Sequence, residues 1–477
     1  GFALTEWSAR GLGLASGMVG RADDVSAIAY NAAGITQLPG VQVMGGMGLI
    51  APMGTLSLDT TYGKQETTTK PAVWAAPHAY ASWQLNDSLW LGLGVFSRFG
   101  LGNSYDQNWT GRYNLYSVNL QTISAVPTLA WKINDILSVS AGLEIMNINL
   151  TTEQKYPAMM GGLIPENDIE VQGSGWGVGG HFGLHARLND QWSVGLAYKT
   201  QVTANVYGEA KYDRHLTGIT NKFDDCDAHG TVQLPDSLAL GVAYKPLDNL
   251  SFEVGAVWTR WSTYNSLNIY MDNGTESISH KNWRDGWNFN ASVEYKPLDW
   301  WSLRAGFWYE TPVVNEDHAD FMVPTNGRTA LTLGTGVEWN DFTIDFAYCH
   351  MWINPTSYDD TDGHGILDSG YITGGTSKDT VATVAEALCK ALDLKPGDKT
   401  FVMINGCGAT TMMEMLVLFK DTVEFLKAKG IEVVASMVGE ILTVQEAAGF
   451  QMNIAKWDEE FIRLWNTPCH TPAYSKE

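Results

Sequence analysis

The chain has 477 residues, a formal net charge of -22 at pH 7 and charged residues at only 17% of its positions. This acidic balance argues against a nucleic-acid partner, and the length favours two or more domains. No run of 18 apolar residues exists that would form a membrane-spanning helix. Instead, 49 glycines and 19 tryptophans with few charges are typical of an outer-membrane β-barrel with aromatic girdles.

Targeting and metal signals are weak. No secretory signal is present at Gly1, and for a secreted barrel we expect it to have been removed. The five cysteines show no CxxC spacing and are odd in number, which favours free thiols over a zinc site or a full disulfide framework. Acidic and histidine residues in segments 212–230 and 359–364 match no familiar metal pattern, and the second segment lacks the later glutamate of a calcium loop. We expect no metal and no cofactor.

Residues 1–40 do not look like strands. Gly11, Gly13, Gly17 and Gly20 punctuate small residues, and residues 25–33 form a short helical run. A small, glycine-rich segment of this kind can fold compactly inside a lumen. We therefore predict an N-terminal hatch, or plug, over residues 1–40.

From residue 41 onward the same turn chemistry occurs six times, at 86–87, 134–135, 189–190, 248–249, 298–299 and 340–341. Asn and Asp bond their own backbone in tight turns, and each turn lies between runs that alternate apolar and polar, which is the hairpin signal. The turns fall 41 to 59 residues apart, whereas two spanning strands use about 20 residues. Short turns therefore alternate with long loops, which predicts an all-β transmembrane antiparallel barrel rather than a sandwich.

The alternation also assigns side chains to faces. One predicted face carries Val194, Leu196, Tyr198, Val202, Ala204 and Val206, opposite Gly195, Lys199, Gln201, Thr203 and Asn205. Another carries Trp287, Phe289, Ala291, Val293 and Tyr295, followed after the turn by Leu303, Ala305, Phe307 and Tyr309. In a barrel the apolar face meets lipid and the polar face lines the lumen.

Thirteen strands can be identified, the last over residues 342–353, and no returning strand follows it. An open edge in lipid leaves backbone groups unpaired. Composition changes near Gly374, because 17 of the 19 tryptophans precede it. Beyond it, strands alternate with helices, which indicates an α/β fold. The predicted domains are a hatch (1–40), a transmembrane barrel (41–374) and an α/β fragment (376–477).

Two blocks carry a resemblance to a known family. The first is Ser8-Ala9-Arg10-Gly11-Leu12-Gly13, Ala22-Asp23-Asp24-Val25-Ser26-Ala27 and Asn31-Ala32-Ala33-Gly34-Ile35-Thr36; the second is Phe99-Gly100-Leu101-Gly102 with Trp109 and Gly111-Arg112-Tyr113. They resemble the long-chain fatty acid transporter family of outer-membrane proteins (FadL-like), although Ala32 stands where the family usually has proline. The resemblance implies fourteen strands, a lumenal hatch and a third strand that bends inward and opens the wall. Gly92 and Gly94 are our candidates for the bend, since strand glycines mark kinks.

The same resemblance implies a multi-pass protein of the Gram-negative outer membrane that takes up long-chain fatty acids passively and releases them sideways into membrane lipid. Its ligand-binding candidates are Phe2, Leu4, Phe99, Gly100, Leu101, Trp109, Arg112, Met159, Met160 and Leu163. Its hatch candidates are Asn31, Ala32, Ala33 and Gly34. Met159, Met160 and Leu163 belong to an apolar loop that either captures ligand or packs against a neighbouring loop.

Two ligand classes remain open for the barrel. A fatty acid needs a partner for its carboxylate, and Arg112 is one candidate, with an ion pair that structures its loop as the alternative. Aromatic hydrocarbons need no such partner. The barrel shows no Ser/His/Asp set, no HExxH and no P-loop, so we do not expect an enzyme.

The tail resembles a different family, the C-terminal part of the dihydroxyacetone kinase substrate-binding subunit. The matching stretches include Ile404-Asn405-Gly406-Cys407-Gly408, Val438-Gly439-Glu440, Glu446-Ala447-Ala448-Gly449-Phe450 and Thr467-Pro468-Cys469-His470-Thr471-Pro472. The histidine that binds dihydroxyacetone in that family lies upstream of the match, so a working kinase subunit is not expected. We interpret the chain as a chimera or fusion joined near Gly375, with a functional interaction or sugar-kinase tail as the alternative.

Overall fold

The computed structural model describes residues 1–60, 63–156, 166–215, 223–315, 318–323, 326–356, 377–406, 410–439, 441, 450–470 and 475–476. The chain divides into two compact units, which are taken separately below. One comprises residues 1–155 and 168–369, and the other comprises residues 156–167 and 370–477. Among the described residues, no helix is both long and apolar enough to span a membrane.

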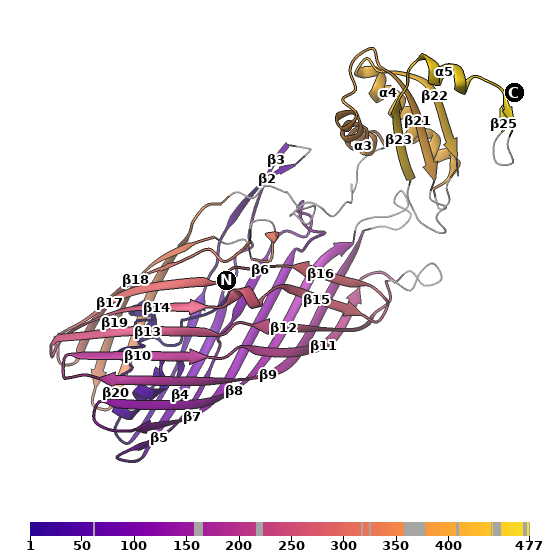
Figure 1. Ribbon diagram of the computed structural model, residues 1–477. Helices are drawn as coiled ribbons and strands as arrows, with labels where there is room; N and C mark the ends of the chain where they lie inside the picture. The colour runs from indigo at the N-terminus through magenta and orange to yellow at the C-terminus, as the bar shows by residue number, and fades with distance from the viewer. Residues whose placement is uncertain are drawn as a thin grey trace. The chain divides into compact units, whose positions relative to one another are not determined.

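The first unit is built on one antiparallel sheet of 18 strands (Figure 1). The strands that cross without interruption are β1 (Val41–Ile50), β4 (Trp74–Asn86), β7 (Ser117–Lys132), β8 (Leu137–Tyr156), β9 (Asn167–Arg187), β18 (Trp301–Glu310), β19 (Arg328–Trp339) and β20 (Phe342–Ile353). Five crossings are each made of two strands: β5 (Leu89–Phe96) with β6 (Gly100–Ser104), β10 (Trp192–Lys199) with β11 (Val202–Tyr212), β12 (Cys226–Leu234) with β13 (Ser237–Leu247), β14 (Leu250–Thr259) with β15 (Ser266–Met271), and β16 (Glu276–His280) with β17 (Gly286–Leu298). The described residues thus form thirteen crossings. A separate hairpin pairs β2 (Thr55–Thr60) with β3 (Gly63–Thr68).

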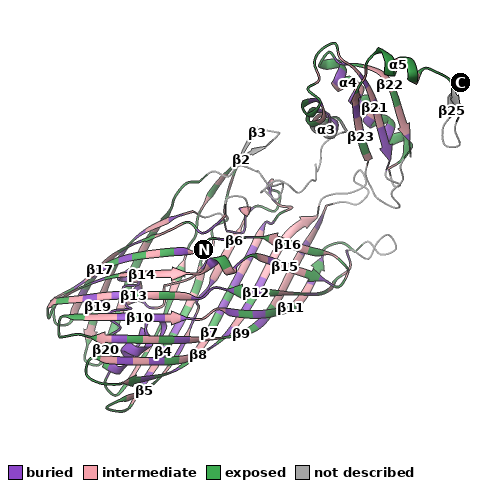
Figure 2. Cartoon of the chain, in the orientation of Figure 1, coloured by how far each residue is buried: buried purple, intermediate pink, exposed green. Residues whose placement is uncertain are grey.

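All six predicted turns connect paired strands, from β4–β5 to β19–β20. Figure 2 shows exposure alternating along the strands, as a sheet with two different faces requires. On β17 and β18 the prediction of faces is confirmed: Phe289 and Phe307 are exposed, whereas Glu294, Arg304 and Trp308 are buried. The apolar face of these strands therefore points outward and the charged face inward.

The prediction that the apolar residues between positions 194 and 206 share one face of the sheet is wrong. Leu196 on β10 is exposed, whereas Val202, Ala204 and Val206 on β11 are buried, so the apolar residues of the two strands point to opposite sides. The strand is interrupted at residues 200–201, and one residue of slip moves every following side chain to the other face. Lys199, predicted opposite Val202, therefore shares the inward side with it.

Strands β1 and β20 are the ends of the sheet. β1 pairs with β4 and β20 pairs with β19, and no pairing joins β1 to β20 among the residues that the structure describes. Their outward apolar side chains are well exposed: Val43 on β1 is 77% and Phe346 on β20 is 69% exposed. The helix α1 (Ala9–Gly13) packs against β18, β19, β20 and β1, so it covers the lumenal side of this seam.

Residues 1–40 hold α1, the short helix α2 (Ala27–Tyr30) and the 3-10 helix η1 (Ala32–Gln37). Ser8 caps α1 by accepting from Gly11 N, and Asn31 caps η1 by accepting from Ala33 N. Residues 25–36 of this segment are buried. Gly92 and Gly94 lie where Ile28 approaches β5, and a Cβ on Gly94 would come within 2.8 Å of the Ile28 Cγ2 atom. These glycines therefore allow the N-terminal segment to pack against the wall.

The second unit is α/β. Strands β21 (Lys399–Gly406), β22 (Glu432–Gly439) and β23 (Phe450–Lys456) form one sheet, in which β21 is parallel to β22 and antiparallel to β23. Helices α3 (Ser377–Ala391), α4 (Met412–Ala428) and α5 (Glu459–Trp465) accompany it. A further two-stranded pair joins β24 (Cys469–His470) to β25 (Ser475–Lys476). Val381, Val402, Ile404, Leu426 and Ile454 belong to the core of this unit.

Candidate functional site

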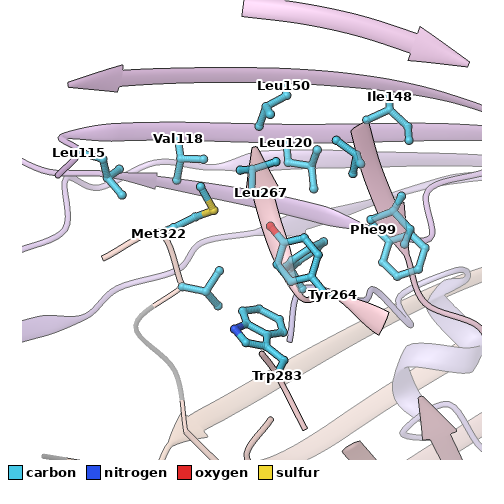
Figure 3. Packing of buried hydrophobic residues seen from close by; sticks show 14 of the residues in the cluster. Phe99, Leu115, Val118, Leu120, Ile148, Leu150, Tyr264, Leu267, Trp283 and Met322 are labelled. Atoms are coloured by element: carbon cyan, nitrogen blue, oxygen red, sulfur yellow. The ribbon is translucent and has the colours of Figure 1, made fainter. Parts of the chain in front are cut away.

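A large group of buried apolar side chains fills part of the barrel lumen. This lumenal apolar cluster draws on β7, β8, β11, β12 and β15, on the segments around residues 261–264 and 313–323, and on the N-terminus. Figure 3 shows Phe99, Tyr264, Leu267 and Trp283 converging with aliphatic side chains from neighbouring strands. Binding sites for small apolar molecules are concave and lined mainly by such residues. The cluster is therefore the candidate binding site.

Phe2 occupies the centre of an aromatic cage within this cluster. Its ring lies 4.8 Å from the Trp261 ring, 5.6 Å from Tyr264, 5.7 Å from Trp283 and 6.2 Å from Phe99, all edge to face. Edge-to-face aromatic pairs are favourable contacts. The N-terminus thus places one apolar ring where an apolar ligand would bind.

The same N-terminal segment pairs with the wall as a short strand. Leu4 N donates to Arg98 O at 2.8 Å and Gly100 N donates to Phe2 O at 3.0 Å, around an antiparallel bridge between Ala3 and Phe99. Phe99 turns its own backbone toward β7, where its N–H donates to Thr122 Oγ1. Residues 2–4 therefore hydrogen-bond the edge of the third crossing that faces β4.

Between the short turn and this bridge, β4 pairs with the same edge of the third crossing. That β4–β5 ladder ends at the Ala79–Val95 pair. Among the described residues, the next backbone hydrogen bond between these two chain segments is the one that Lys70 N donates to Ser104 O at 2.8 Å. Between these pairs, no ladder joins residues 71–78 to residues 96–103, all of which are described. We call this unpaired stretch of the wall the side window.

The third crossing breaks at residues 97–99, beside the side window. Phe96 pairs with Ser124 and Gly100 with Gln121, so the third crossing has one residue more than β7 between these two pairs. Such an extra residue is a β-bulge, and it bends the strand. The prediction that Gly92 or Gly94 marks the bend is wrong, because both lie in regular pairing with β4 and β7. Their missing side chains instead make room for Ile28.

Apart from the backbone of residues 2–4, side chains fill the side window. A Cβ on Gly102 would come within 2.1 Å of the Trp74 ring, and a Cβ on Gly100 within 3.1 Å of Leu4 Cδ1. The Trp74 Nε1 atom is buried and has no hydrogen-bond partner among the described residues. Gln84 N donates to Gly40 O, just before β1, so the backbone N–H and C=O groups of odd-numbered residues of β4 point toward the third crossing. Pro77 is odd and lacks a donor, which suits an unpaired edge.

A basic group lies beside the cluster. Arg98 Nη1 donates to Glu144 Oε2 at 2.5 Å, and Glu144 also accepts from Ser124 Oγ at 2.6 Å. The His181 Nε2 atom lies 2.9 Å from the same carboxylate. Buried Lys199 places its Nζ 3.7 Å from the centre of the Trp7 ring, and no carboxylate in the described part of the chain forms an ion pair with it. Arg98 therefore pairs with Glu144, whereas Lys199 has no ion-pair partner among the described residues.

The N-terminal segment is bound tightly to the wall of the barrel. Glu253 Oε1 accepts from Val19 N and Gly20 N at 2.9 Å each, and its Oε2 accepts from Arg21 N at 2.8 Å. Arg10 donates to both carboxylate oxygens of Glu294. Burial by itself lowers the pKa of Arg10, but the carboxylates of Asp23, Glu294 and Asp24 outweigh it and raise that pKa well above its usual value. Arg10 therefore stays charged within this network.

Comparison with known proteins identifies the family of this chain. The family model described as "Outer membrane protein transport protein (OMPP1/FadL/TodX)" matches residues 1–388, which is most of the chain. The chain belongs to this family. It is accordingly an outer-membrane β-barrel protein of a family that transports hydrophobic molecules, and its main body is not an enzyme.

Individual relatives are distant. A long-chain fatty acid transport protein of Escherichia coli is 23% identical over 401 residues, covering 76% of this chain and 89% of the relative. An outer-membrane protein of Neisseria meningitidis is 24% identical over 395 residues, covering 72% and 84%. The solved FadL homologue of Pseudomonas aeruginosa has a TM-score of 0.67 at 19% identity, covering 74% of this chain and 91% of that structure. The toluene transporter TodX of Pseudomonas putida has a TM-score of 0.55 at 18% identity, covering 68% and 87%.

The tail matches a second family, the Dak1 domain, over residues 368–473. The dihydroxyacetone-binding subunit of a dihydroxyacetone kinase from Listeria innocua is 37% identical over 90 residues, but the chain covers only 27% of that relative. A FadL-family body and a kinase-related tail are thus fused in one chain.

The predicted site residues fall in several places. Phe2, Phe99 and Trp109 belong to the lumenal apolar cluster, and Leu101 packs against it. Leu4 and Gly100 meet at the side window. Asn31 donates from Nδ2 to Val19 O and Leu184 O, and Ala32, Ala33 and Gly34 are buried in η1. Met159, Met160 and Leu163 lie outside the described residues.

Arg112 has several neighbours within its own segment. It donates to Trp109 O at 3.1 Å and to Tyr113 Oη at 2.5 Å, and it lies over the Tyr113 ring at 4.3 Å. These are the contacts of a residue that structures a loop. Sequence reasoning missed Trp74 and Lys199. Pro77 in the middle of a strand is the signal that could have located the side window, since proline is confined to unpaired edges and bulges.

Proposed function

We propose that the barrel takes up long-chain fatty acids, which bind in the lumenal apolar cluster and leave through the side window into membrane lipid. The observation that carries this proposal is Lys199, whose buried amine lies over the Trp7 ring of the N-terminal segment and forms no ion pair with a described carboxylate. A buried charge is costly unless it is paired. A ligand with an apolar chain and a carboxylate supplies both the missing partner and the apolar volume.

Burial of the chain drives binding. Each buried methylene contributes about 0.8 kcal/mol, so roughly 15 methylenes give on the order of 12 kcal/mol before entropic costs. Release into water would have to return all of this energy. Release into lipid returns almost none, because lipid is equally apolar, and a side exit therefore makes uptake a passive process.

The N-terminal strand couples binding to release. Phe2 lies in the aromatic cage while Leu4 lies at the side window, two residues away on the same short strand. Displacing Phe2 costs about 1.5–3 kcal/mol of apolar burial, and the two backbone hydrogen bonds to residues 98 and 100 contribute about 0.5–1.5 kcal/mol each. A fatty-acid chain can offset these costs. When Phe2 moves, Leu4 moves with it and the side window opens.

The rest of the N-terminal segment stays in place in this mechanism. Breaking one buried ion pair costs about 3–5 kcal/mol, and Arg10 and Arg21 both make such contacts with the wall. A route through the barrel axis would have to break several of them. The route through the side window leaves the pairs of Arg10 and Arg21 intact and disturbs the contacts of Gly1, whose carbonyl accepts from Arg328 Nη2 and whose amine lies 3.9 Å from Glu310.

Aromatic hydrocarbons are the competing ligand class, and the relative TodX is named for toluene. They fit the apolar cluster but leave Lys199 without a partner. The test is uptake by proteoliposomes that contain the full chain, with radiolabelled oleate and toluene in parallel. We expect saturable oleate uptake above that of empty vesicles, with no saturable toluene uptake. The reverse pattern would assign the barrel to hydrocarbons.

For the tail we propose no kinase activity. It corresponds to about a quarter of its relative, and the histidine that binds dihydroxyacetone in that family lies upstream of the matched region. Substrate binding by the tail would contradict this view, and its test is given in the Discussion.

A further inference from the structure

A second irregularity in the wall lies between β12 and β15. These strands pair only where Ala228, His229 and Gly230 meet Met271, Tyr270 and Ile269. Toward the periplasmic end, residues 231–234 and 266–268 carry no pairing between them. A pit of about 420 Å³ occurs here, lined in part by Asn205, Thr231, Gln233, Asn265, Ser266 and Asn268. We call it the outer pit.

Three rings border the outer pit. Tyr207 pairs with His229 across β11 and β12, and His229 pairs with Tyr270 across β12 and β15. The His229 and Tyr270 rings stack, with centroids 5.7 Å apart and an interplanar angle of 29°. Tyr207 is 66% exposed. A row of aromatic faces therefore lies open to the outside of the barrel.

The remaining lining is polar but uncharged. Amides and hydroxyls predominate, and no Asp, Glu, Lys or Arg is among the described residues that line the outer pit. Thr231 Oγ1 donates to Asn205 Oδ1 at 3.0 Å. Asn268 Oδ1 is buried with no hydrogen-bond partner among the described residues, although buried polar atoms normally have one. An incoming hydroxyl would satisfy this acceptor.

The outer pit lies just beyond the apolar band of the barrel. On the same crossing, outward-facing Leu238 and Leu240 are exposed apolar residues, whereas Gln233 faces outward five residues before Leu238. Five residues of strand span roughly 17 Å. Because the short Asn/Asp turns lie at the opposite end, this level is that of the polar headgroups on the outer side.

We propose that the outer pit binds the saccharide headgroup of an outer-leaflet glycolipid. Sugars present neutral hydroxyls, which suit amide and hydroxyl partners, together with C–H faces that pack on aromatic rings. A phosphate or carboxylate would require a cation, and an acyl chain would leave the amides unpaired. A glycolipid headgroup is available at this height without diffusing from the medium. The site is separate from the lumenal cluster, so it does not depend on the transport proposal.

The test uses the full chain purified in detergent and rough lipopolysaccharide as the probe. Binding is measured by microscale thermophoresis for wild type and for the double variant Tyr207→Ala/Asn268→Ala. Loss of one ring contact and one hydrogen bond should weaken binding roughly tenfold or more. The matched control is Tyr348→Ala, which removes an outward tyrosine of similar exposure, 64%, on β20. Heat-modifiability on gels verifies that each barrel is folded.

Weaker binding by the double variant, with wild-type binding by Tyr348→Ala, supports the proposal. Equal binding by wild type and double variant would overturn it. Free core oligosaccharide, prepared by removing the lipid, is the second probe. If it binds as tightly as the intact glycolipid, the site recognises a soluble sugar, and the assignment to a membrane glycolipid fails.

Discussion

The Trp74 ring lies against Gly102, so close that a Cβ on the glycine would come within 2.1 Å of the indole. Trp74 belongs to β4 and Gly102 to β6, two strands whose backbones do not pair at this level. The contact therefore joins the two strands at a level where no ladder hydrogen bonds connect them. Since the indole N–H has no partner among the described residues, apolar packing and shape hold it there, and this contact can be opened without breaking a polar bond.

Trp74→Ala tests the side window directly. Removing the indole should widen the opening, and oleate uptake by proteoliposomes should rise by roughly threefold if passage through the window limits the rate. Trp83→Ala is the control, because Trp83 lies on the same strand but is 57% exposed on the outer face. Uptake unchanged in Trp74→Ala, with the barrel still heat-modifiable, would place the exit elsewhere.

Phe2→Ala tests whether the ligand must displace the N-terminal ring. Phe2 is 5% exposed within its aromatic cage, and its burial is worth about 1.5–3 kcal/mol. Without the ring this cost vanishes, so oleate should bind roughly tenfold or more tightly in a fluorescence-displacement assay. Weaker binding would show instead that Phe2 forms part of the wall around the ligand.

The sequence predicts the regular parts of the barrel and fails where strands are interrupted. The Asn/Asp turns and the faces of β17 and β18 follow from local chemistry and from a period of two. At residues 200–201 and 97–99 a strand slips by one residue, and nothing in the local alternation signals the slip. The alternation assigns Lys199 correctly to the lumen. It assigns the apolar residues that follow to the outer face, which is wrong, because they also point inward and belong to the lumenal apolar cluster.

The hatch should be released by Glu253→Gln. Glu253 accepts three backbone N–H groups and lies 3.5 Å from Arg21. Loss of a buried ion-pair partner costs about 3–5 kcal/mol, so the gel conversion temperature should fall and cells should become sensitive to vancomycin. Glu338→Gln is the control, since its pair with Lys296 is partly exposed and surface pairs contribute about 0.2–1 kcal/mol. Equal behaviour of both variants would mean that Glu253 does not anchor the hatch.

The tail should not bind dihydroxyacetone. Isothermal titration of the full chain with dihydroxyacetone is expected to give no heat beyond dilution, because the tail covers only 27% of its kinase relative. An intact dihydroxyacetone-binding subunit serves as the positive control. A saturable signal would show that the tail retains a substrate site.

Lys199→Met separates the two ligand classes. The substitution keeps an unbranched side chain in the lumen but removes the amine that lies over Trp7. A hydrogen bond to a charged group contributes about 1.5–3 kcal/mol, so oleate should bind roughly 10–100-fold more weakly. Toluene, which has no carboxylate, should bind as it does to wild type.

The control for this experiment is Lys245→Met, which removes a half-exposed lysine near the turn that joins β13 to β14. It should leave oleate binding unchanged. If Lys199→Met leaves oleate binding unchanged as well, the carboxylate lies elsewhere, and Arg112 becomes the next residue to substitute. If both ligands weaken equally, Lys199 supports the shape of the cluster and does not recognise charge. Only selective loss of oleate binding agrees with a fatty-acid carboxylate beside Lys199.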